Sequence, residues 1–273
     1  MSDEYVELSK IIDLKKFYEI QINNDYDMLK KYIMGSGFSL IGEGCFATAW
    51  HKNGKVIRTS EIVDGMFLYA CILRKYPELK NSQHAPVIHD ILITENGSSI
   101  LMERLKSIFT LDHHFFYAPS IYYITNNYFY DNISIEEISI DRFIEKYSLN
   151  EFFNSFIKNM SNKEIEYCWE KSLKLSEYCI SLKEKMEEIF GLKNEENIFD
   201  ISDENLMVNK DGELCFLDPF CFSSKSEIYK TLENCKDTPA MMFISEEQKK
   251  WSSFKTDIYD FTDELEKNFS PFC

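Results

Sequence analysis

The feature of this sequence that most constrains its fold is a series of short β-type runs between residues 38 and 60, separated by glycine-containing turns. Gly42-Glu43-Gly44 is expected to form one turn, and Asn53-Gly54 is a strong signal for a tight hairpin. Strands are predicted at 38–41, 45–51 and 56–59, followed by a helix at 61–80 that stops near Pro77, and by two strands that flank residues 95–97. This order predicts an α+β chain with an antiparallel sheet and one helix.

The rest of the chain is expected to be mainly helical. Residues 1–34 show helical, amphipathic spacing, and Gly35 ends that pattern. Residues 162–190 predict one long helix, and the tail after residue 220 looks helical in parts. Residues 106–150 are rich in Phe, Tyr, Ile and Asn, and we expect a partner or substrate surface there. The predicted parts are an N-terminal extension at 1–34, a first lobe at 35–105 and a second lobe at 106–273.

The charge balance limits the classes of partner. The chain has 46 acidic residues against 30 Lys and Arg, a net charge of −16. Nucleic acids and anionic membranes are polyanions, so neither is expected as the main partner. The acidity is typical of a surface that keeps a protein soluble, and the alternative is an acidic face that docks on a basic protein or mimics nucleic acid.

Cysteine usage and the absence of long apolar runs predict a cytoplasmic protein. The eight cysteines form no CxxC pair, so zinc-site spacing is absent, and their scatter is typical of a reduced compartment. The N-terminus does not resemble a signal peptide, and no apolar run approaches the length of a membrane span.

Chemistry-bearing residues are concentrated in the stretch FDISDENLMVNKDGELCFLDPF, residues 199–220. Asn205 and Asp218 supply the hard oxygen ligands that Mg²⁺ prefers, and Asp200 is placed to take a proton from an acceptor hydroxyl. A hairpin predicted from 206–208 and 214–217, with its turn at 209–212, would return Asp218 to the side of Asn205. The alternative is an ordinary surface hairpin flanked by turn-forming Asp and Asn.

These two halves, in this order, resemble the plan of protein kinases. Gly42 and Gly44 match the first two glycines of the glycine-rich loop, and Glu43, Cys45 and Phe46 complete the turn whose backbone would cover the phosphates of ATP. Arg58 falls where the strand-3 lysine belongs. Asp200 and Asn205 match the catalytic-loop Asp and Asn, and Asp218-Pro219-Phe220 falls where the DFG motif belongs.

The resemblance also implies how the adenine base would be held. The segment LMERL, residues 101–105, matches the hinge. Met102 would lie near the gatekeeper position, and Glu103 and Leu105 would offer backbone groups to the base. The implied fold is two-lobed, with an antiparallel sheet and one helix in the first lobe and a reduced, mainly helical second lobe.

Within that superfamily the chain is most similar to the early serine/threonine kinases of lytic podophages, over roughly residues 28–105 and 165–226. This resemblance implies transfer of the ATP γ-phosphate, with Mg²⁺, to Ser or Thr of host proteins in the host cytoplasm. It also implies self-phosphorylation, for which a transient homodimer would be needed.

Several positions depart from the kinase pattern. The third glycine is Ala47, Arg58 replaces a lysine, and Ser202 stands where typical kinases have a catalytic-loop lysine. Lys55 is the nearest other cation that could reach the phosphates, and no evident Glu in the following helix pairs with Arg58, the nearest acids being Glu61 and Asp64.

These departures leave two alternatives open. One is a pseudokinase, weak or inactive, that binds and inhibits a host protein. The other is a small-molecule phosphotransferase, which ranks last because its catalytic loop usually has a His and its substrate lobe is larger. The pair His113-His114 has no further ligand cluster in the sequence and is expected to be structural.

Overall fold

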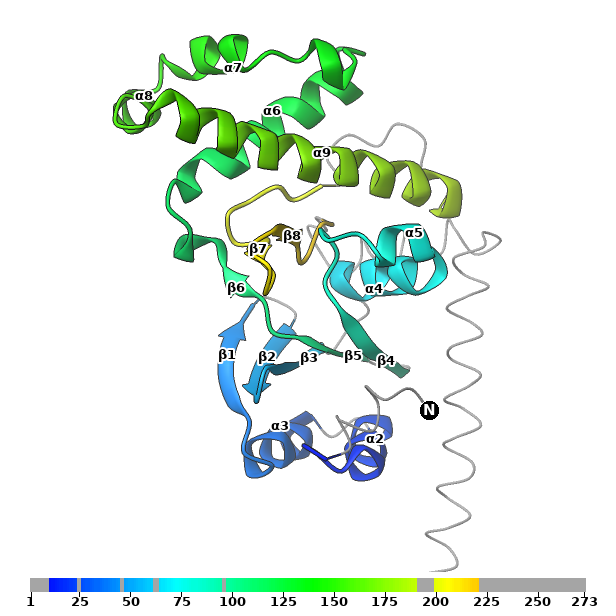
Figure 1. Ribbon diagram of the computed structural model, residues 1–273. Coiled ribbons are helices and arrows are strands. Elements are labelled where there is room, and N and C mark those ends of the chain that lie inside the picture. Colours follow the sequence, from blue (N-terminus) through cyan, green and yellow to red (C-terminus); the bar gives the residue numbers. More distant parts are fainter. Residues whose placement is uncertain are drawn as a thin grey trace, which may run out of the picture. The chain divides into compact units, whose positions relative to one another are not determined.

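The computed structural model describes residues 10–23, 26–44, 47–60, 64–94, 97–190 and 199–220. The described chain is α+β and divides into two compact units (Figure 1). The first unit contains residues up to 71 together with 87–104, and the second contains 72–86 together with the chain from 105 onward through the described hairpin.

The first unit is built on a five-stranded antiparallel sheet, as the sequence predicted. Its strand order is β1 (Ser39–Glu43), β2 (Ala47–Lys52), β3 (Lys55–Ser60), β5 (Gly97–Glu103) and β4 (Ile88–Thr94). The hairpin between β2 and β3 turns through Asn53 and Gly54, whose φ angles of 49° and 78° are both positive. Two such residues in succession are what a tight primed turn requires, so this signal was correct.

One predicted boundary in this unit was wrong. Gly42 and Glu43 belong to β1, and the turn begins at Gly44, whose N–H donates to the Ala47 carbonyl at 2.8 Å. The helix predicted to stop near Pro77 does stop there: α4 (Gly65–Lys75) ends two residues before it, and Pro77 opens a separate short helix, α5 (Pro77–Lys80). Pro77 is tolerated as the first residue of a helix but not inside one, because it has no N–H to donate.

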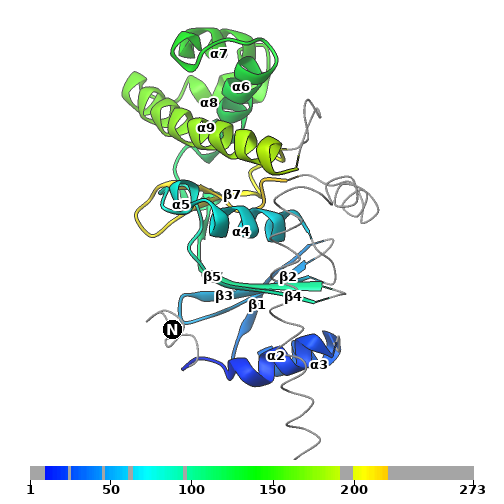
Figure 2. The same ribbon diagram turned by 90° about the vertical axis from the view of Figure 1, so that its right-hand side faces the viewer.

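Helices α2 (Leu14–Ile22) and α3 (Tyr26–Gly35) cover one face of this sheet, and α4 begins on the other (Figure 2). The Ser99 hydroxyl on β5 donates to the side-chain carbonyl of Gln21 on α2, and both residues are buried. Trp50, Ile57 and Leu101 share the cross-strand row on the α2 face and are at most 2 % exposed. This face forms the main apolar core of the first unit.

The helix α3 ends at Gly35, as the sequence predicted, but another glycine terminates it. The chain turns at Gly37, which has φ of 84°, with hydrogen bonds from Gly37 N–H to the Met34 carbonyl and from Phe38 N–H to the Ile33 carbonyl. This pair of bonds, with a left-handed residue after the helix, is the Schellman arrangement.

The second unit combines a small sheet with a helical layer. Strands β6 (Lys106–Ser107), β7 (Leu206–Val208) and β8 (Leu214–Phe216) form the three-stranded sheet. The helical segments after β6 are η1 (Ile108–Thr110), η2 (His114–Phe116), α6 (Tyr117–Phe129), η3 (Ile135–Glu137), α7 (Ile140–Tyr147), α8 (Glu151–Ile157) and α9 (Asn162–Phe190). The long helix predicted at 162–190 has the observed bounds of α9.

The aromatic-rich segment packs against α9. Helices α6 and α9 approach closely enough for the buried hydroxyls of Ser120 and Ser172 to hydrogen-bond at 2.6 Å. Phe143 of α7 is fully buried and contacts Phe116, Phe153 and Trp169, with ring centroids 5.3 to 5.5 Å apart. Tyr117 and Tyr123 of α6 and Phe143 of α7 therefore belong to the core of this unit, whereas Tyr122 of α6 is exposed.

No helix among the described residues is both long enough and apolar enough to cross a membrane. The predicted tail after residue 220, including its helical parts, lies outside the described residues.

We predict that the two glycines near the end of α3 respond oppositely to alanine. Gly37→Ala should lower the free energy of unfolding by about 1 kcal/mol, because an L residue is strained at φ of 84°. Gly35→Ala, the matched control, should be neutral or stabilising by up to about 1 kcal/mol, because Gly35 lies inside the helix with no described atom within 4 Å of an added Cβ. Urea denaturation measures both. Equal effects of the two substitutions would contradict the assignment of Gly37 as the helix terminator.

Candidate functional site

The structure brings Asp200, Asn205 and Asp218 together at one end of the β7–β8 hairpin. Asn205 directly precedes β7, and Asp218 follows β8 after one residue. The Leu217 N–H donates to the Asn205 carbonyl at 2.9 Å, and the Asp200 N–H donates to the Pro219 carbonyl at 3.0 Å. Backbone hydrogen bonds thus tie the segment before the hairpin to the segment after it.

The side chain of Asn205 is oriented by this loop. Its Nδ2 donates to the Asp200 carbonyl at 3.2 Å. Because the amide nitrogen is engaged in this way, the amide oxygen is the atom that Asn205 can present to a cation. Asp200, Asn205 and Asp218 are all half-buried. The donor types therefore fit Mg²⁺, which is commonly held by one or two protein oxygens together with nucleotide phosphates.

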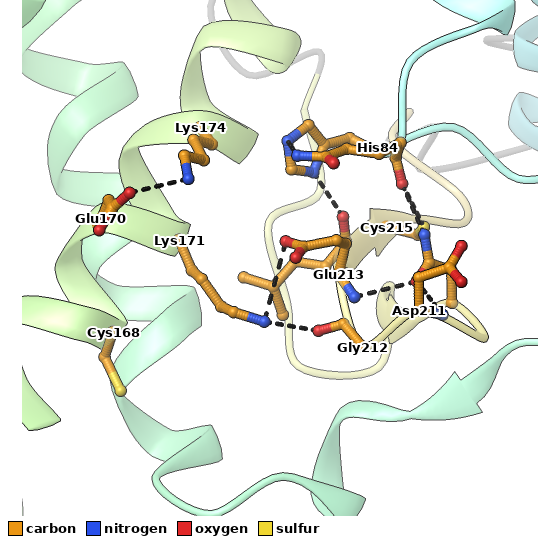
Figure 3. Close-up of polar contacts among 12 residues, drawn as sticks. His84, Cys168, Glu170, Lys171, Lys174, Asp211, Gly212, Glu213 and Cys215 are labelled. Carbon is orange, nitrogen blue, oxygen red and sulfur yellow. Dashed lines mark hydrogen bonds and ion pairs between the residues drawn. The ribbon is translucent and has the colours of Figure 1, made fainter.

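The hairpin that positions these residues is fastened to α9 and to the segment 81–86, as Figure 3 shows. Lys171 of α9 donates to the Gly212 carbonyl at 2.6 Å and lies 3.8 Å from the Glu213 carboxylate. His84 Nδ1 lies 2.7 Å from the Leu214 carbonyl and donates to it, since a carbonyl only accepts. The Asn209 side chain donates to the Gln83 carbonyl at 3.0 Å. The turn and β8 are thus held from outside the hairpin.

The loop between Asp200 and Asn205 contains a second carboxylate, which the sequence did not single out. Asp203 Oδ1 is buried and has no hydrogen-bond partner among the described residues. Burial raises the pKa of Asp203 above its ordinary value, and the nearby His114 partly offsets this rise. His114 belongs to η2, so the aromatic-rich segment borders the candidate catalytic loop within the second unit.

In the first unit, Gly42 and Arg58 lie on one row across the sheet. Gly42 of β1 is opposite Ala49 of β2, and Ala49 is opposite Arg58 of β3. Residues directly opposite in a sheet point to the same face, so Ala49 lies next to Arg58 on this face and Gly42 lies one strand further along the row. An added Cβ at Gly42 would meet no described atom within 4 Å, so the described packing gives no reason for glycine there.

Arg58 of β3 has an acidic partner, although the helix that follows, α4, offers no evident Glu. Arg58 Nη1 lies 2.5 Å from Asp64 Oδ2, and Asp64 Oδ1 accepts the Phe67 N–H at 3.0 Å. Asp64 therefore caps the start of α4 and holds Arg58 at the same time. The alternative cation, Lys55, is instead paired with Glu103 and close to His89, which argues against it as a phosphate contact.

Strand geometry adds apolar residues that the sequence prediction missed. Val56 of β3 is opposite Met102 of β5, and both lie on the sheet face of Arg58 because they are two residues away from its row. Val56 and Met102 are 6 % and 3 % exposed, so this face offers a buried apolar surface beside the cation. Counting by twos along β3 from Arg58 would have identified Val56.

The remaining expected adenine contacts fall on both sides of the unit boundary. The Glu103 N–H already donates to the Val87 carbonyl at 3.0 Å, which leaves its carbonyl group as the candidate for a base. Leu105, half-buried, is the first residue of the second unit after the expected hinge. Cys45 and Phe46 of the glycine-rich turn lie outside the described residues, and so does Glu61.

Other chemistries find little support in the described chain. No group of three or more His, Cys, Asp or Glu side chains is arranged there to hold a metal ion by itself. Cys71, Cys168, Cys179 and Cys215 are buried, and burial raises the pKa of the Cys215 thiol to about 12. A thiol in that state is a poor nucleophile at neutral pH.

No protein-family model matches this sequence, and neither does any curated protein.

We predict that His84 makes the stability of the second unit depend on pH. Burial lowers the pKa of His84 below its ordinary value, and its hydrogen bond to Leu214 opposes this shift only in part. The folded state therefore binds a proton less readily than the unfolded state. The free energy of unfolding should be highest above about pH 6.5. It should fall as the pH drops from there through the pKa of His84 in the folded state, by at most about 1.4 kcal/mol per pH unit.

The measurement is urea denaturation at several pH values for the wild type and His84→Asn. The variant should be less stable at neutral pH, because it loses the buried ring, and its stability should vary less steeply with pH. Identical pH slopes for the two proteins would show that His84 does not titrate between the folded and unfolded states.

Proposed function

We propose that this chain is an ATP-dependent protein kinase of the phage type, which phosphorylates serine or threonine residues of host proteins and its own chain. The observation that carries the proposal is the convergence of Asp200, Asn205 and Asp218 through the backbone bonds around the β7–β8 hairpin. The resemblance assigns these residue types to proton acceptance and metal binding, and the loop geometry is compatible with both roles.

In this proposal the second unit supplies the reaction chemistry. Asn205 and Asp218 would hold Mg²⁺, which neutralises charge on the nucleotide phosphates. Asp200 would orient the acceptor hydroxyl and accept its proton. Ser202, which replaces a lysine of typical kinases, contributes its carbonyl to the Asn205 and Leu206 N–H groups, so it shapes the loop without adding charge.

The first unit would supply the nucleotide contacts. The ion pair between Arg58 and Asp64 fixes a cation in the position where the resemblance expects one. Gly42 and Ala49 leave space beside it, and Val56 and Met102 provide an apolar surface suited to a purine. The loop sequence at residues 199–205 has no His, which favours a kinase over the small-molecule phosphotransferases, whose catalytic loop usually has one.

We predict that purified protein incubated with Mg·ATP gains phosphate, detected by intact mass. Asp200→Ala should slow this gain at least about a hundredfold, because a positioned general base contributes that much or more. Asp218→Asn should act similarly through loss of the metal ligand. Asp211→Ala is the matched control, since Asp211 is an exposed acid in the turn of the same hairpin and should leave transfer unchanged.

Equal phosphate gain by the wild type and Asp200→Ala would contradict the proposed base. Binding of Mg·ATP without transfer to the chain or to any added protein would favour the pseudokinase alternative, which the replacements at Arg58 and Ser202 motivate. Absence of nucleotide binding would contradict the proposal as a whole.

We also predict a charge requirement at position 58. Arg58→Met should weaken Mg·ATP binding by about tenfold or more, whereas Arg58→Lys should largely preserve it, because the contact needs a cation. Lys31→Met, which removes an exposed cation from α3, is the control and should have no effect. Isothermal titration calorimetry measures the three affinities. Unchanged affinity in Arg58→Met would exclude Arg58 as a phosphate contact.

A further inference from the structure

The second unit exposes a continuous aromatic surface, here called the aromatic surface, formed by Phe109, His114, Phe115, Phe152 and Phe156. Phe109, Phe115 and Phe152 are 56 %, 37 % and 64 % exposed. The ring centroids of Phe115 lie 5.3 Å from Phe152 and 5.8 Å from Phe156, and His114 lies between Phe109 and Phe115 at 5.2 and 3.8 Å. Large rings that touch one another while facing solvent are typical of an interaction site.

The backbone holds this surface in a fixed conformation. His113 has φ of 62°, a left-handed conformation that is uncommon for residues other than glycine. Its ring contacts Phe156 at 5.8 Å, and its Nε2 lies 3.3 Å from the Glu164 carboxylate at the start of α9. The next residue after Phe115, Phe116, is fully buried in the core. The exposed rings are therefore presented on an anchored turn, which lowers the entropy lost on binding.

The segments that carry the aromatic surface, together with the loop 199–205 that borders it at His114, contain more acidic than basic residues. Segments 106–116, 149–164 and 199–205 contain three lysines, Lys106, Lys158 and Lys163, against six acids, Asp112, Glu151, Glu164, Asp200, Asp203 and Glu204. Asp112 and Glu151 are exposed. In the sequence Glu151 directly precedes Phe152, and Asp112 lies two residues before His114. Aromatic faces beside carboxylates favour arginine or lysine together with an apolar side chain.

The same charge disfavours other occupants. A second copy related by two-fold symmetry would place this acidic surface against itself, so like charges would oppose each other. Anionic membranes and nucleic acids are repelled for the same reason, and the chain has a net charge of −16.

We propose that the aromatic surface docks a basic segment of another protein, in which a large apolar side chain is flanked by arginine or lysine. The apolar side chain packs against Phe115 and Phe152, and the flanking cations meet the surrounding carboxylates. Docking requires neither nucleotide nor phosphate transfer, so this inference stands independently of the proposed kinase activity.

The test uses the full chain without nucleotide and a fluorescein-labelled peptide that has a phenylalanine flanked on both sides by arginines. Fluorescence anisotropy should show saturable binding that weakens at least about tenfold when the phenylalanine is replaced by serine, and likewise when the arginines are replaced by glutamates. The double variant Phe115→Ser, Phe152→Ser should lose affinity by a similar factor.

Two further variants separate the contribution of the aromatic surface to binding from that of other exposed rings and of the neighbouring carboxylates. Tyr122→Ser removes an exposed aromatic ring of α6 outside the aromatic surface and should bind as the wild type does. Asp112→Asn combined with Glu151→Gln should weaken binding and reduce its dependence on salt. All five substituted positions are exposed, so melting temperatures should stay within about 2 °C of the wild type.

Several results would overturn the proposal. These are an absence of saturable binding, equal affinity of the double Phe variant and the wild type, or equal affinity for the phenylalanine and serine peptides. Sedimentation that shows a wild-type dimer and a monomeric double Phe variant would assign the surface to a second copy instead. Phe-dependent binding to phosphatidylserine vesicles would assign it to a membrane.

Discussion

The candidate catalytic loop depends on the backbone bonds that close the chain around the β7–β8 hairpin. Asp200 N–H bonds the Pro219 carbonyl, Leu217 N–H bonds the Asn205 carbonyl, and Phe199 and Phe220 form an antiparallel bridge just outside them. These bonds use main-chain atoms only. Substitutions of the Asp200 and Asp218 side chains can therefore remove chemistry while the frame that positions them persists, which is why the loop is open to a functional test.

The β7–β8 hairpin is not stable by itself, because its strands of three residues form too few backbone hydrogen bonds to fold alone. Lys171 of α9 holds the turn through Gly212, and His84 holds β8 through Leu214. Both contacts lie away from the candidate site. The stability of the site is thus set by residues that take no part in the proposed chemistry, and protonation of His84 would affect the site through the hairpin.

The sequence predicted those features that depend on local patterns, and it failed where pairing between distant segments decides. Helix α9, the hairpin after Asn205 and the Asn53-Gly54 turn follow from periodicity and turn residues. The placement of Gly42 in β1 depends on its pairing with Ala49 after an irregularity in register between Leu40 and Gly42. The sequence named Glu61 and Asp64 as the acids nearest Arg58 but could not identify Asp64 as its partner, because that pairing requires β3 and the start of α4 to meet in space. The packing of residues 106–150 on α9 has the same origin.

The net charge of the chain sets opposite demands on its two proposed ligands. A net charge of −16 repels a nucleotide, so in the proposed site Mg²⁺ and the cation of Arg58 would have to provide the local attraction that the whole molecule does not. The same charge attracts a basic protein segment to the aromatic surface. Added salt screens both effects, so it weakens docking while it reduces the long-range repulsion of the nucleotide. A chain with this charge distribution is therefore suited to find a basic protein first, and to depend on a few fixed cations for any chemistry that follows.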